Sequence, residues 1–362
     1  MKKQVLFLAL GVAIAASLAA ATVAQAADTA KTVKVFLLAG QSNMQGMAFT
    51  ADMEKQAENL KYKDLYKNLR KDGKWIVRED VFLKYGKHKA PLTVGFGGAR
   101  RRTGVEFAFG SMMGDHFDEP VLLIKTAWGG HSLFQQFCSP SRLPEKEKKF
   151  QQDMATWEKA HEAALKIGPK IRLRDPGNVR FKPQPYGSSY RAMLAEVKET
   201  FDKYETMFPA LKGRKLELAG FVWFQGWNDM YGGAENEYAS NMKHFIKDVR
   251  KDLGVPNLPF VIGALGQNGS KPATGGMLAV REAQMAMNDV PEFKGNVKAF
   301  RADLLADKEA ERVYEGWQKH IEEWNKVGSD RPYHYLGSAI WFNRIGKAMG
   351  EAMLELLKGQ KE

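Results

Sequence analysis

Ser42 is the residue of this sequence whose type and position are best suited to chemistry, because it directly follows a buried strand. Residues 33–38 are apolar or β-branched apart from Lys34, as in a central strand. In an open parallel sheet, ligands bind beyond the carboxyl ends of the strands. A serine on a tight turn at that edge presents its hydroxyl to a crevice. The alternative is a strand-ending turn with a capping serine.

Three other predicted strands also end in polar, glycine-rich sequence. They are residues 121–125, 216–224 and 260–266, and they are followed by Trp128-Gly129-Gly130, Gln225-Gly226 and Gln267-Asn268. Carboxyl ends of parallel strands meet at one edge of a sheet. Core strands rarely need such loops for packing, so their convergence favours a functional Ser42.

The elements that position these residues alternate along the chain. Helices are expected at residues 104–117, 147–167, 190–208, 235–253, 277–288, 317–327 and 338–357, a short hairpin strand within 75–84, and a fifth strand at 297–302. This alternation predicts an α/β fold, a flavodoxin-like three-layer α/β/α sandwich with a doubly wound, mainly parallel sheet. The charged, proline-punctuated stretch 140–185 is expected to be a surface insertion in a single domain of residues 27–362.

Residues 1–26 have the features of a secretory signal peptide. Lys2 and Lys3 precede an apolar, alanine-rich run, and Ala24-Gln25-Ala26 matches a small-x-small cleavage site. A membrane anchor is the weaker alternative because the strongly apolar part is short. The sequence therefore predicts an exported protein, periplasmic or secreted, with no membrane span in the mature chain.

Composition restricts the partners. The 362 residues carry a net charge of +12, two units of which belong to Lys2 and Lys3. This surplus suits acidic partners such as an anionic polysaccharide, whereas the scattered basic residues and the lack of a nucleic-acid motif argue against nucleic acid. Cys138, the single cysteine, is expected to be a small buried hydrophobe and not a reactive thiol. No metal-binding or nucleotide-binding pattern is apparent, so neither a metal nor a cofactor is expected.

Five motifs in order along the chain resemble a known family. They are Gly40-Gln41-Ser42-Asn43-Met44, Gly104-Val105-Glu106-Phe107-Ala108-Phe109-Gly110, Ala127-Trp128-Gly129-Gly130, Trp223-Phe224-Gln225-Gly226-Trp227-Asn228-Asp229, and His334 near the C-terminus. Together they are similar to SGNH-type hydrolases of the sialate O-acetylesterase and acetylxylan esterase group of carbohydrate esterases. Each motif alone is weak, but the set covers most of the chain.

The resemblance implies a role for particular residues. Ser42 would be the nucleophile, and its N–H with Gly104 and Gln225 would form the oxyanion hole. Ester cleavage needs such donors beside an activated hydroxyl and a base. Gln225 could instead be a capping amide, and Gly97 and Gly98 leave the Gly104 assignment open. His334 is the favoured base, with His131 as its rival.

The resemblance leaves the third member of the triad open. Family members mostly have aspartate three residues before the histidine, whereas Asp330 lies four residues before His334 and Arg331 occupies the expected place. Asp330 is the favoured acid, and Asp303 or no acid at all are the alternatives.

Three residues are expected to contact substrate. Trp128 and Trp227 offer sugar-stacking faces, although core tryptophans would look the same, and Trp227 stands where the family often has glutamate. Arg102 belongs to a run of arginines just before Gly104 and is expected to favour an anionic polysaccharide; a solvated charge run is the alternative.

The expected function is therefore that of an exported, cofactor-free serine esterase that removes O-acetyl groups from carbohydrates, such as sialate or a polysaccharide. One alternative is an SGNH esterase acting on another acyl group or a non-sugar ester. The other is a carbohydrate-binding relative that kept the fold and lost turnover.

Overall fold

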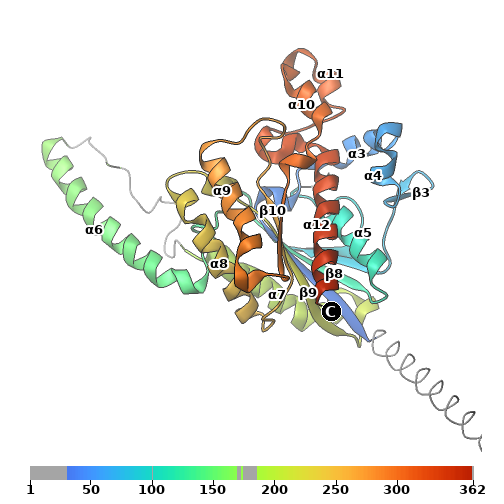
Figure 1. Ribbon diagram of the computed structural model, residues 1–362, viewed down its shortest axis with the longest axis horizontal. Helices are drawn as coiled ribbons and strands as arrows, with labels where there is room; N and C mark the ends of the chain where they lie inside the picture. The colour runs from blue at the N-terminus through green and yellow to red at the C-terminus, as the bar shows by residue number, and fades with distance from the viewer. Residues whose placement is uncertain (1–30, 100, 169–172, 174–185, 361–362) are drawn as a thin grey trace, which may run out of the picture.

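The fold is built on one large central sheet (Figure 1), seen in a computed structural model that describes residues 31–99, 101–168, 173 and 186–360. Seven strands lie in the order β11-β10-β9-β1-β8-β5-β6, and all neighbours are parallel except β5 and β6. Their bounds in that order are Val297–Arg301, Phe260–Ala264, Lys215–Phe224, Thr32–Gly40, Val121–Ala127, Val81–Tyr85 and His88–Pro91.

The strand β1 lies at the point where the winding of the sheet reverses. From β1 the chain builds β5 and β8 on one side and then crosses to form β9, β10 and β11 on the other. In doubly wound sheets, ligands bind at such a switch point, outside the carboxyl ends of the strands. Ser42 follows β1 at this end, so the topology puts the predicted nucleophile at the expected place.

Helices cover both faces of the sheet because side chains of β1 alternate between two cores. Phe36 and Leu38 join the core under α5 and α12, whereas Val35 and Leu37 join the core under α7, α8 and α9. Figure 1 shows α5 and α12 on one side of the sheet and α8 and α9 on the other. These helices span Glu106–His116, Ala339–Gly359, Ser188–Met207, Ala234–Asp252 and Gly275–Met285.

The structure confirms the predicted three-layer, mainly parallel α/β sandwich and departs from the expected elements at three places. Two short ladders, β2 with β7 and β3 with β4, lie outside the main sheet. Of the hairpin strand expected within 75–84, only the C-terminal end belongs to the main sheet, as the start of β5. The helix expected over 317–327 is broken at His320 into η9 and α11. The bounds of these elements are Ala48–Phe49, Arg102–Thr103, Arg70–Lys71, Lys74–Trp75, Trp317–Lys319 and Ile321–Trp324.

Within the expected insertion 140–185, helix α6 (Leu143–Ile167) extends away from the body of the protein (Figure 1). Only Lys146 of its residues is buried. Cys138, just before it, is buried and free, as predicted, and burial raises the pKa of its thiol to about 12. The expected signal peptide lies outside the described residues. Within the described part of the chain, no helix is both long and apolar enough to span a membrane.

Candidate active site

The turn that carries Ser42 is fixed by close backbone packing at the end of β1. A Cβ on Gly40 would lie 2.1 Å from the carbonyl oxygen of Phe224, so only glycine lets β1 approach β9 there. Ser42 then begins the one-turn helix α2 (Ser42–Gln45), which ends at Gly46. Gly46 has a φ of +90°, and a Cβ on it would lie 2.5 Å from Gly104 Cα. Both glycines therefore hold Ser42 at the sheet edge.

His334 lies on a tight loop, η10 (Pro332–Gly337), just before α12. Tyr335 and Leu336 follow it with φ values of +52° and +59°, in the left-handed region that non-glycine residues rarely adopt. The fully buried Tyr335 ring packs on Phe224, with the centroids 5.4 Å apart, and its hydroxyl accepts a hydrogen bond from the Gly266 N–H. Strained residues cluster at functional sites, and here the strain and the Tyr335 anchor fix the direction of His334.

The structure brings Asp330 and His334 together. Asp330 Oδ2 lies 3.0 Å from His334 Nδ1. The ring N–H does not point along this line, so the contact is close but is not an aligned hydrogen bond. Within the loop the N–H of His334 donates to the carbonyl of Arg331, which folds residues 330–334 into a turn. This turn explains how an aspartate four residues away reaches the imidazole.

Asp330 is held by more than its histidine. The Arg102 guanidinium donates to Oδ2 at 3.1 Å, and the Arg331 N–H donates to Oδ1 at 2.8 Å. Burial raises the pKa of Asp330, but His334, the Arg331 N–H and Arg102 outweigh it and lower the pKa to about 2. The carboxylate is therefore charged at neutral pH.

Arg102 takes a role that the sequence did not predict. Besides Asp330, its guanidinium donates to the Met47 carbonyl at 3.1 Å and lies over the Phe49 ring, 4.7 Å from the centroid. Arg102 therefore positions the acid of the site. The predicted contact of Arg102 with an anionic substrate stays a prediction.

Asn43 joins the turn that carries Ser42 to η10, the loop that carries His334. Its amide donates to the Tyr333 carbonyl at 3.0 Å, and Tyr333 is the neighbour of His334. Among the described residues, the Ser42 hydroxyl and backbone N–H have no hydrogen-bond partner. Ser42 and His334 therefore belong to adjoining segments, and catalytic hydrogen bonds often tighten only when substrate binds.

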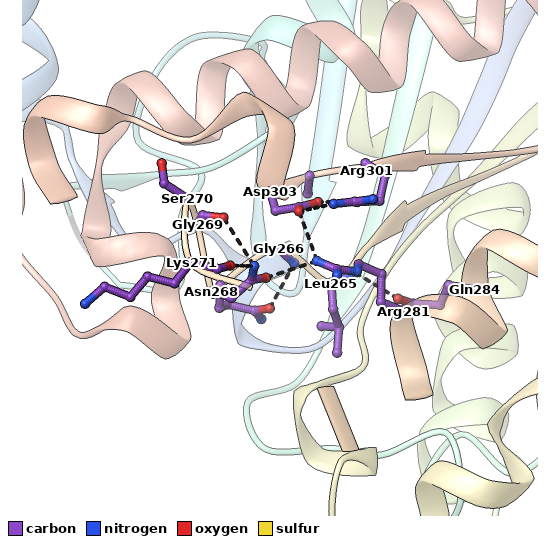
Figure 2. A network of polar contacts seen from close by, with 12 residues as sticks. Leu265, Gly266, Asn268, Gly269, Ser270, Lys271, Arg281, Gln284, Arg301 and Asp303 are labelled. Atoms are coloured by element: carbon purple, nitrogen blue, oxygen red, sulfur yellow. Dashed lines mark hydrogen bonds and ion pairs between the residues drawn. The ribbon is translucent and has the colours of Figure 1, made fainter. Parts of the chain in front are cut away.

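The alternative base and acid are engaged elsewhere. His131 Nδ1 lies 2.6 Å from the Ser189 hydroxyl of α7, and burial lowers the pKa of this histidine. Asp303 accepts hydrogen bonds from Arg281 at 2.9 Å and from Arg301 at 2.6 Å, as Figure 2 shows. Of the candidate histidines and aspartates, His334 and Asp330 are the two that lie together, on the loop that Asn43 joins to the Ser42 turn.

The two predicted oxyanion donors besides Ser42 are occupied. The Gly104 N–H donates to Glu106 Oε1 at 2.9 Å. The Gln225 amide nitrogen donates to Asp229 Oδ2 at 2.6 Å and to the His131 carbonyl at 3.1 Å. Burial raises the pKa of Asp229 to about 6, against the N–H groups that bind it. Both donors are thus directed at buried carboxylates in this conformation.

The two predicted sugar-stacking tryptophans lie in different surroundings. Trp128 is half-buried and stacks on the His131 ring, with an interplanar angle of 17°. Trp227 is half-buried and lies 5.9 Å from the Tyr333 ring, next to His334. Trp227 also lines a cleft of about 830 Å³, together with Tyr231, Pro332 and Leu336. The cleft therefore opens beside η10, the loop that carries His334.

One wall of this cleft is a loop held by a dense set of polar contacts (Figure 2). Arg281 donates to Asn268, and the Ser270 N–H donates to Glu311 at 2.7 Å. Gln267, at the same strand end, also lines the cleft. No cluster of three or more His, Cys, Asp or Glu side chains that could hold a metal ion occurs in the described part of the chain.

Sequence reasoning missed Arg102 and Tyr335 as positioning residues, since nothing in their spacing reveals a contact across more than a hundred residues. The strained backbone after His334 was also not foreseen. A signal was present for Asn43 and Asp229, which stand within the Ser42 and Gln225 motifs.

The fold is a three-layer α/β/α sandwich, and the loop that holds His334 and Asp330 is joined through Asn43 to the Ser42 turn at the switch point of the sheet. A model of the family described as carbohydrate esterase, sialic acid-specific acetylesterase, matches residues 32–170 and 178–311. The chain belongs to this family of carbohydrate esterases. The match ends before Asp330 and His334, so these two residues rest on the geometry above. A comparison with curated protein sequences gives no match.

Several solved structures are similar in fold. A protein from Arabidopsis thaliana is 15% identical with a TM-score of 0.48, covering 89% of this chain and 97% of that one. A carbohydrate acetylesterase from Xanthomonas citri is 13% identical with a TM-score of 0.45, covering 90% and 57%. NanS is 11% identical with a TM-score of 0.41, covering 75% and 78%. The family match, and not these similarities, carries the assignment.

Proposed function

We propose that this carbohydrate esterase is an exported serine hydrolase that removes O-acetyl groups from sugars, with Ser42 as nucleophile, His334 as base and Asp330 as the orienting acid. The observation that carries the proposal is the 3.0 Å approach of Asp330 Oδ2 to His334 Nδ1. The loop that holds this pair is joined to the Ser42 turn through Asn43. A charged aspartate on one ring nitrogen leaves the other free to take a proton.

In the proposed mechanism, the Ser42 hydroxyl attacks the acetyl carbonyl while His334 removes its proton. The tetrahedral intermediate collapses, the sugar hydroxyl leaves with the proton from His334, and an acetyl group stays on Ser42. A water molecule, deprotonated by His334, then releases acetate and restores the serine. Asp330 stays charged throughout and stabilises the imidazolium.

The developing oxyanion needs donors, and the Ser42 N–H is unengaged among the described residues. Gly104 and Gln225 could serve only after turning away from Glu106 and Asp229. We propose that Ser42 supplies the first donor and that Gln225 joins it when substrate binds.

The substrate would enter the cleft lined by Trp227. An aromatic face beside polar groups suits the apolar face of a pyranose ring and its hydroxyls. The net charge of +12 supports an acidic glycan, and the features of residues 1–26 support export to the periplasm or the medium.

The function is tested by acetate release from a panel of O-acetylated sialic acids and polysaccharides. Wild type is compared with Ser42→Ala and with Ser111→Ala, a control that removes a buried hydroxyl without a hydrogen-bond partner from α5. We expect release by wild type and the control and none by Ser42→Ala at an unchanged melting temperature. Equal release by Ser42→Ala would contradict the serine mechanism.

The occupied donors of Gly104 and Gln225 favour a second candidate, a carbohydrate-binding relative without turnover. It predicts saturable glycan binding by wild type with no acetate release from any substrate of the panel. Release from aryl or other acyl esters alone would instead indicate an esterase for a different ester.

A further inference from the structure

A buried lysine lies directly beneath the proposed nucleophile turn. Lys125 stands near the carboxyl end of β8, in register with Leu38 of β1, and its side chain is 0% exposed. Its ammonium donates to the carbonyl of Gln45 at 2.7 Å, to the carbonyl of Phe96 at 2.8 Å and to Glu106 Oε2 at 2.9 Å. An ammonium has three N–H donors, so every one of them is used.

The three acceptors belong to three separate segments around the site. Gln45 is the last residue of α2, the helix that Ser42 begins. Phe96 lies in the glycine-rich loop whose Gly97 N–H donates to the carbonyl of Arg102, the residue that holds Asp330. The Lys125 ammonium therefore connects the turn that carries Ser42 to the loop that holds Arg102 against Asp330.

Glu106 extends this connection to the third segment. It is fully buried, and its second oxygen accepts from the Gly104 N–H at 2.9 Å and from the Thr103 hydroxyl at 3.3 Å. Gly104 in turn packs against Gly46, at the end of α2. The Lys125–Glu106 pair thus holds the end of the Ser42 turn twice, directly at Gln45 and through Gly104, which packs on Gly46.

A buried ion pair is poor evidence for stability, because an apolar pair of similar volume is often equally stable. Burial lowers the pKa of Lys125 against the attraction of Glu106, so the fold works against the charge here. An apolar side chain could fill the space but could not donate to Gln45 and Phe96. The chemistry that only the ammonium supplies is the fixing of three backbone segments.

From this geometry we infer that Lys125 and Glu106 are positioning residues that align the Ser42 turn with the loop that carries His334. Neither touches the substrate. The inference rests on the proposed serine mechanism, because its effect is exerted on Ser42. Loss of the pair is expected to lower kcat and the rate at which Ser42 reacts, with KM unchanged.

The test compares Lys125→Met/Glu106→Gln with Lys84→Met. The double variant removes both charges, so we expect it to stay close to wild type in melting temperature. Lys84 is a matched control, a buried lysine of β5 whose ammonium pairs with Glu196 and Glu199 of α7. Lys84→Met leaves a carboxylate without its partner at the surface, and we expect it to lower the melting temperature and keep kcat.

Misplacement of a reacting group by about 1 Å costs on the order of a hundredfold in rate. We expect the double variant to lose about tenfold to a hundredfold in kcat for an aryl acetate. We expect a similar loss in the rate of Ser42 modification by an organophosphonate. Wild-type values for both rates in the folded double variant would overturn the inference.

A third variant covers failure of the double variant to fold. Lys125→Arg keeps the charge opposite Glu106, but its planar guanidinium cannot reproduce three bonds from one nitrogen atom. A folded Lys125→Arg enzyme with unchanged kcat would overturn the inference. Ser42→Ala in the same assays separates this outcome from failure of the serine mechanism, because an active Ser42→Ala enzyme contradicts the mechanism itself.

Discussion

The base side and the oxyanion side of the site differ in how far they are assembled. On the base side, Asp330 already lies 3.0 Å from His334 and is fixed by Arg102. On the oxyanion side, the N–H groups of Gly104 and Gln225 donate to the buried carboxylates of Glu106 and Asp229. One side holds a carboxylate against the imidazole, whereas the donors of the other side are bound to carboxylates.

The difference shows which contacts have to change during catalysis. Donors aimed at an oxyanion act best when they are fixed before the reaction, and here they are fixed on other acceptors. We therefore expect most of the rate to depend on His334 and Asp330. A smaller share should depend on Gln225, which has to exchange a carboxylate for the oxyanion.

The largest expected effect is that of His334→Ala. Since members of a triad act as a unit, kcat should fall as far as in Ser42→Ala, on the order of 10⁴-fold to 10⁶-fold. The measurement is kcat for an aryl acetate, with His131→Ala as control. Full activity of His334→Ala with loss in His131→Ala would transfer the base role to His131.

The next largest effect on kcat is expected for Asp330→Asn. The amide cannot stabilise an imidazolium and favours the wrong ring tautomer, so kcat should fall by about 10³-fold to 10⁴-fold. Asp303→Asn is the matched control, because Asp303 pairs with Arg281 and Arg301 and not with the histidine. It should lower the melting temperature and keep kcat. Full activity of Asp330→Asn would reduce the triad to a Ser42–His334 dyad.

Gln225→Ala tests the oxyanion side. If Gln225 turns to the oxyanion, its loss should lower kcat by about a hundredfold or more, and the melting temperature should fall because Asp229 loses a donor. Gln136→Ala, a change at another buried amide that accepts from the Ser132 N–H, is the control for the stability effect. A lower melting temperature with normal kcat would show that Ser42 acts without Gln225.

Arg102→Met should have the smallest effect on rate. The acid keeps its charge but loses one of its fixed donors, so we expect a fall in kcat on the order of tenfold. Kinetics of the variant on aryl acetate and on an acidic glycan measure this. An unchanged kcat with a raised KM only for the acidic glycan would instead support the predicted contact of Arg102 with substrate.

Arg102→Met should also change how the free energy of unfolding depends on pH. The pKa of Asp330 is lowered to about 2 in the fold, from an ordinary value of 3.8. Its contribution to the free energy of unfolding is therefore present above the ordinary value and is lost as the pH falls towards the lower one. Arg102→Met should bring the folded-state pKa of Asp330 closer to its ordinary value. The free energy of unfolding, measured by urea melts between pH 5 and pH 3 (about the range in which aspartates titrate), should therefore fall less than in wild type. An identical pH dependence would contradict the role of Arg102 at Asp330.

The main sheet could be predicted where strands are buried on both faces. β1, β8, β9 and β10 are mostly apolar, and long apolar runs are characteristic of central parallel strands. The edge strand β6 could not, because its residues His88–Pro91 are mostly exposed and show no apolar pattern. The helix expected over 317–327 is broken because His320 has a non-helical backbone, with φ −144° and ψ 53°, and its ring nitrogen contacts the Val313 carbonyl.

The site could be predicted in part. The Ser42 turn follows from local sequence, because a strand, a glycine and a short polar run are enough to indicate it. The sequence favours Asp330 as the acid but leaves alternatives open, because the approach to His334 depends on a turn with two left-handed residues that local sequence does not reveal. Lys125 lies within a mostly apolar strand, and only the folded structure shows that its ammonium contacts α2, the loop at Phe96 and α5.

The central claim is that Ser42 carries the acetyl group during turnover, and trapping that intermediate tests it most directly. Wild type is mixed briefly with an aryl acetate, quenched in acid, digested and analysed by peptide mass spectrometry, with Ser42→Ala and Ser111→Ala beside it. We expect an acetyl group on the peptide containing Ser42 in wild type and in Ser111→Ala, and none on that peptide in Ser42→Ala. Acetate release by Ser42→Ala at the wild-type rate, or an acetyl group on another residue with Ser42 unmodified, would contradict this claim.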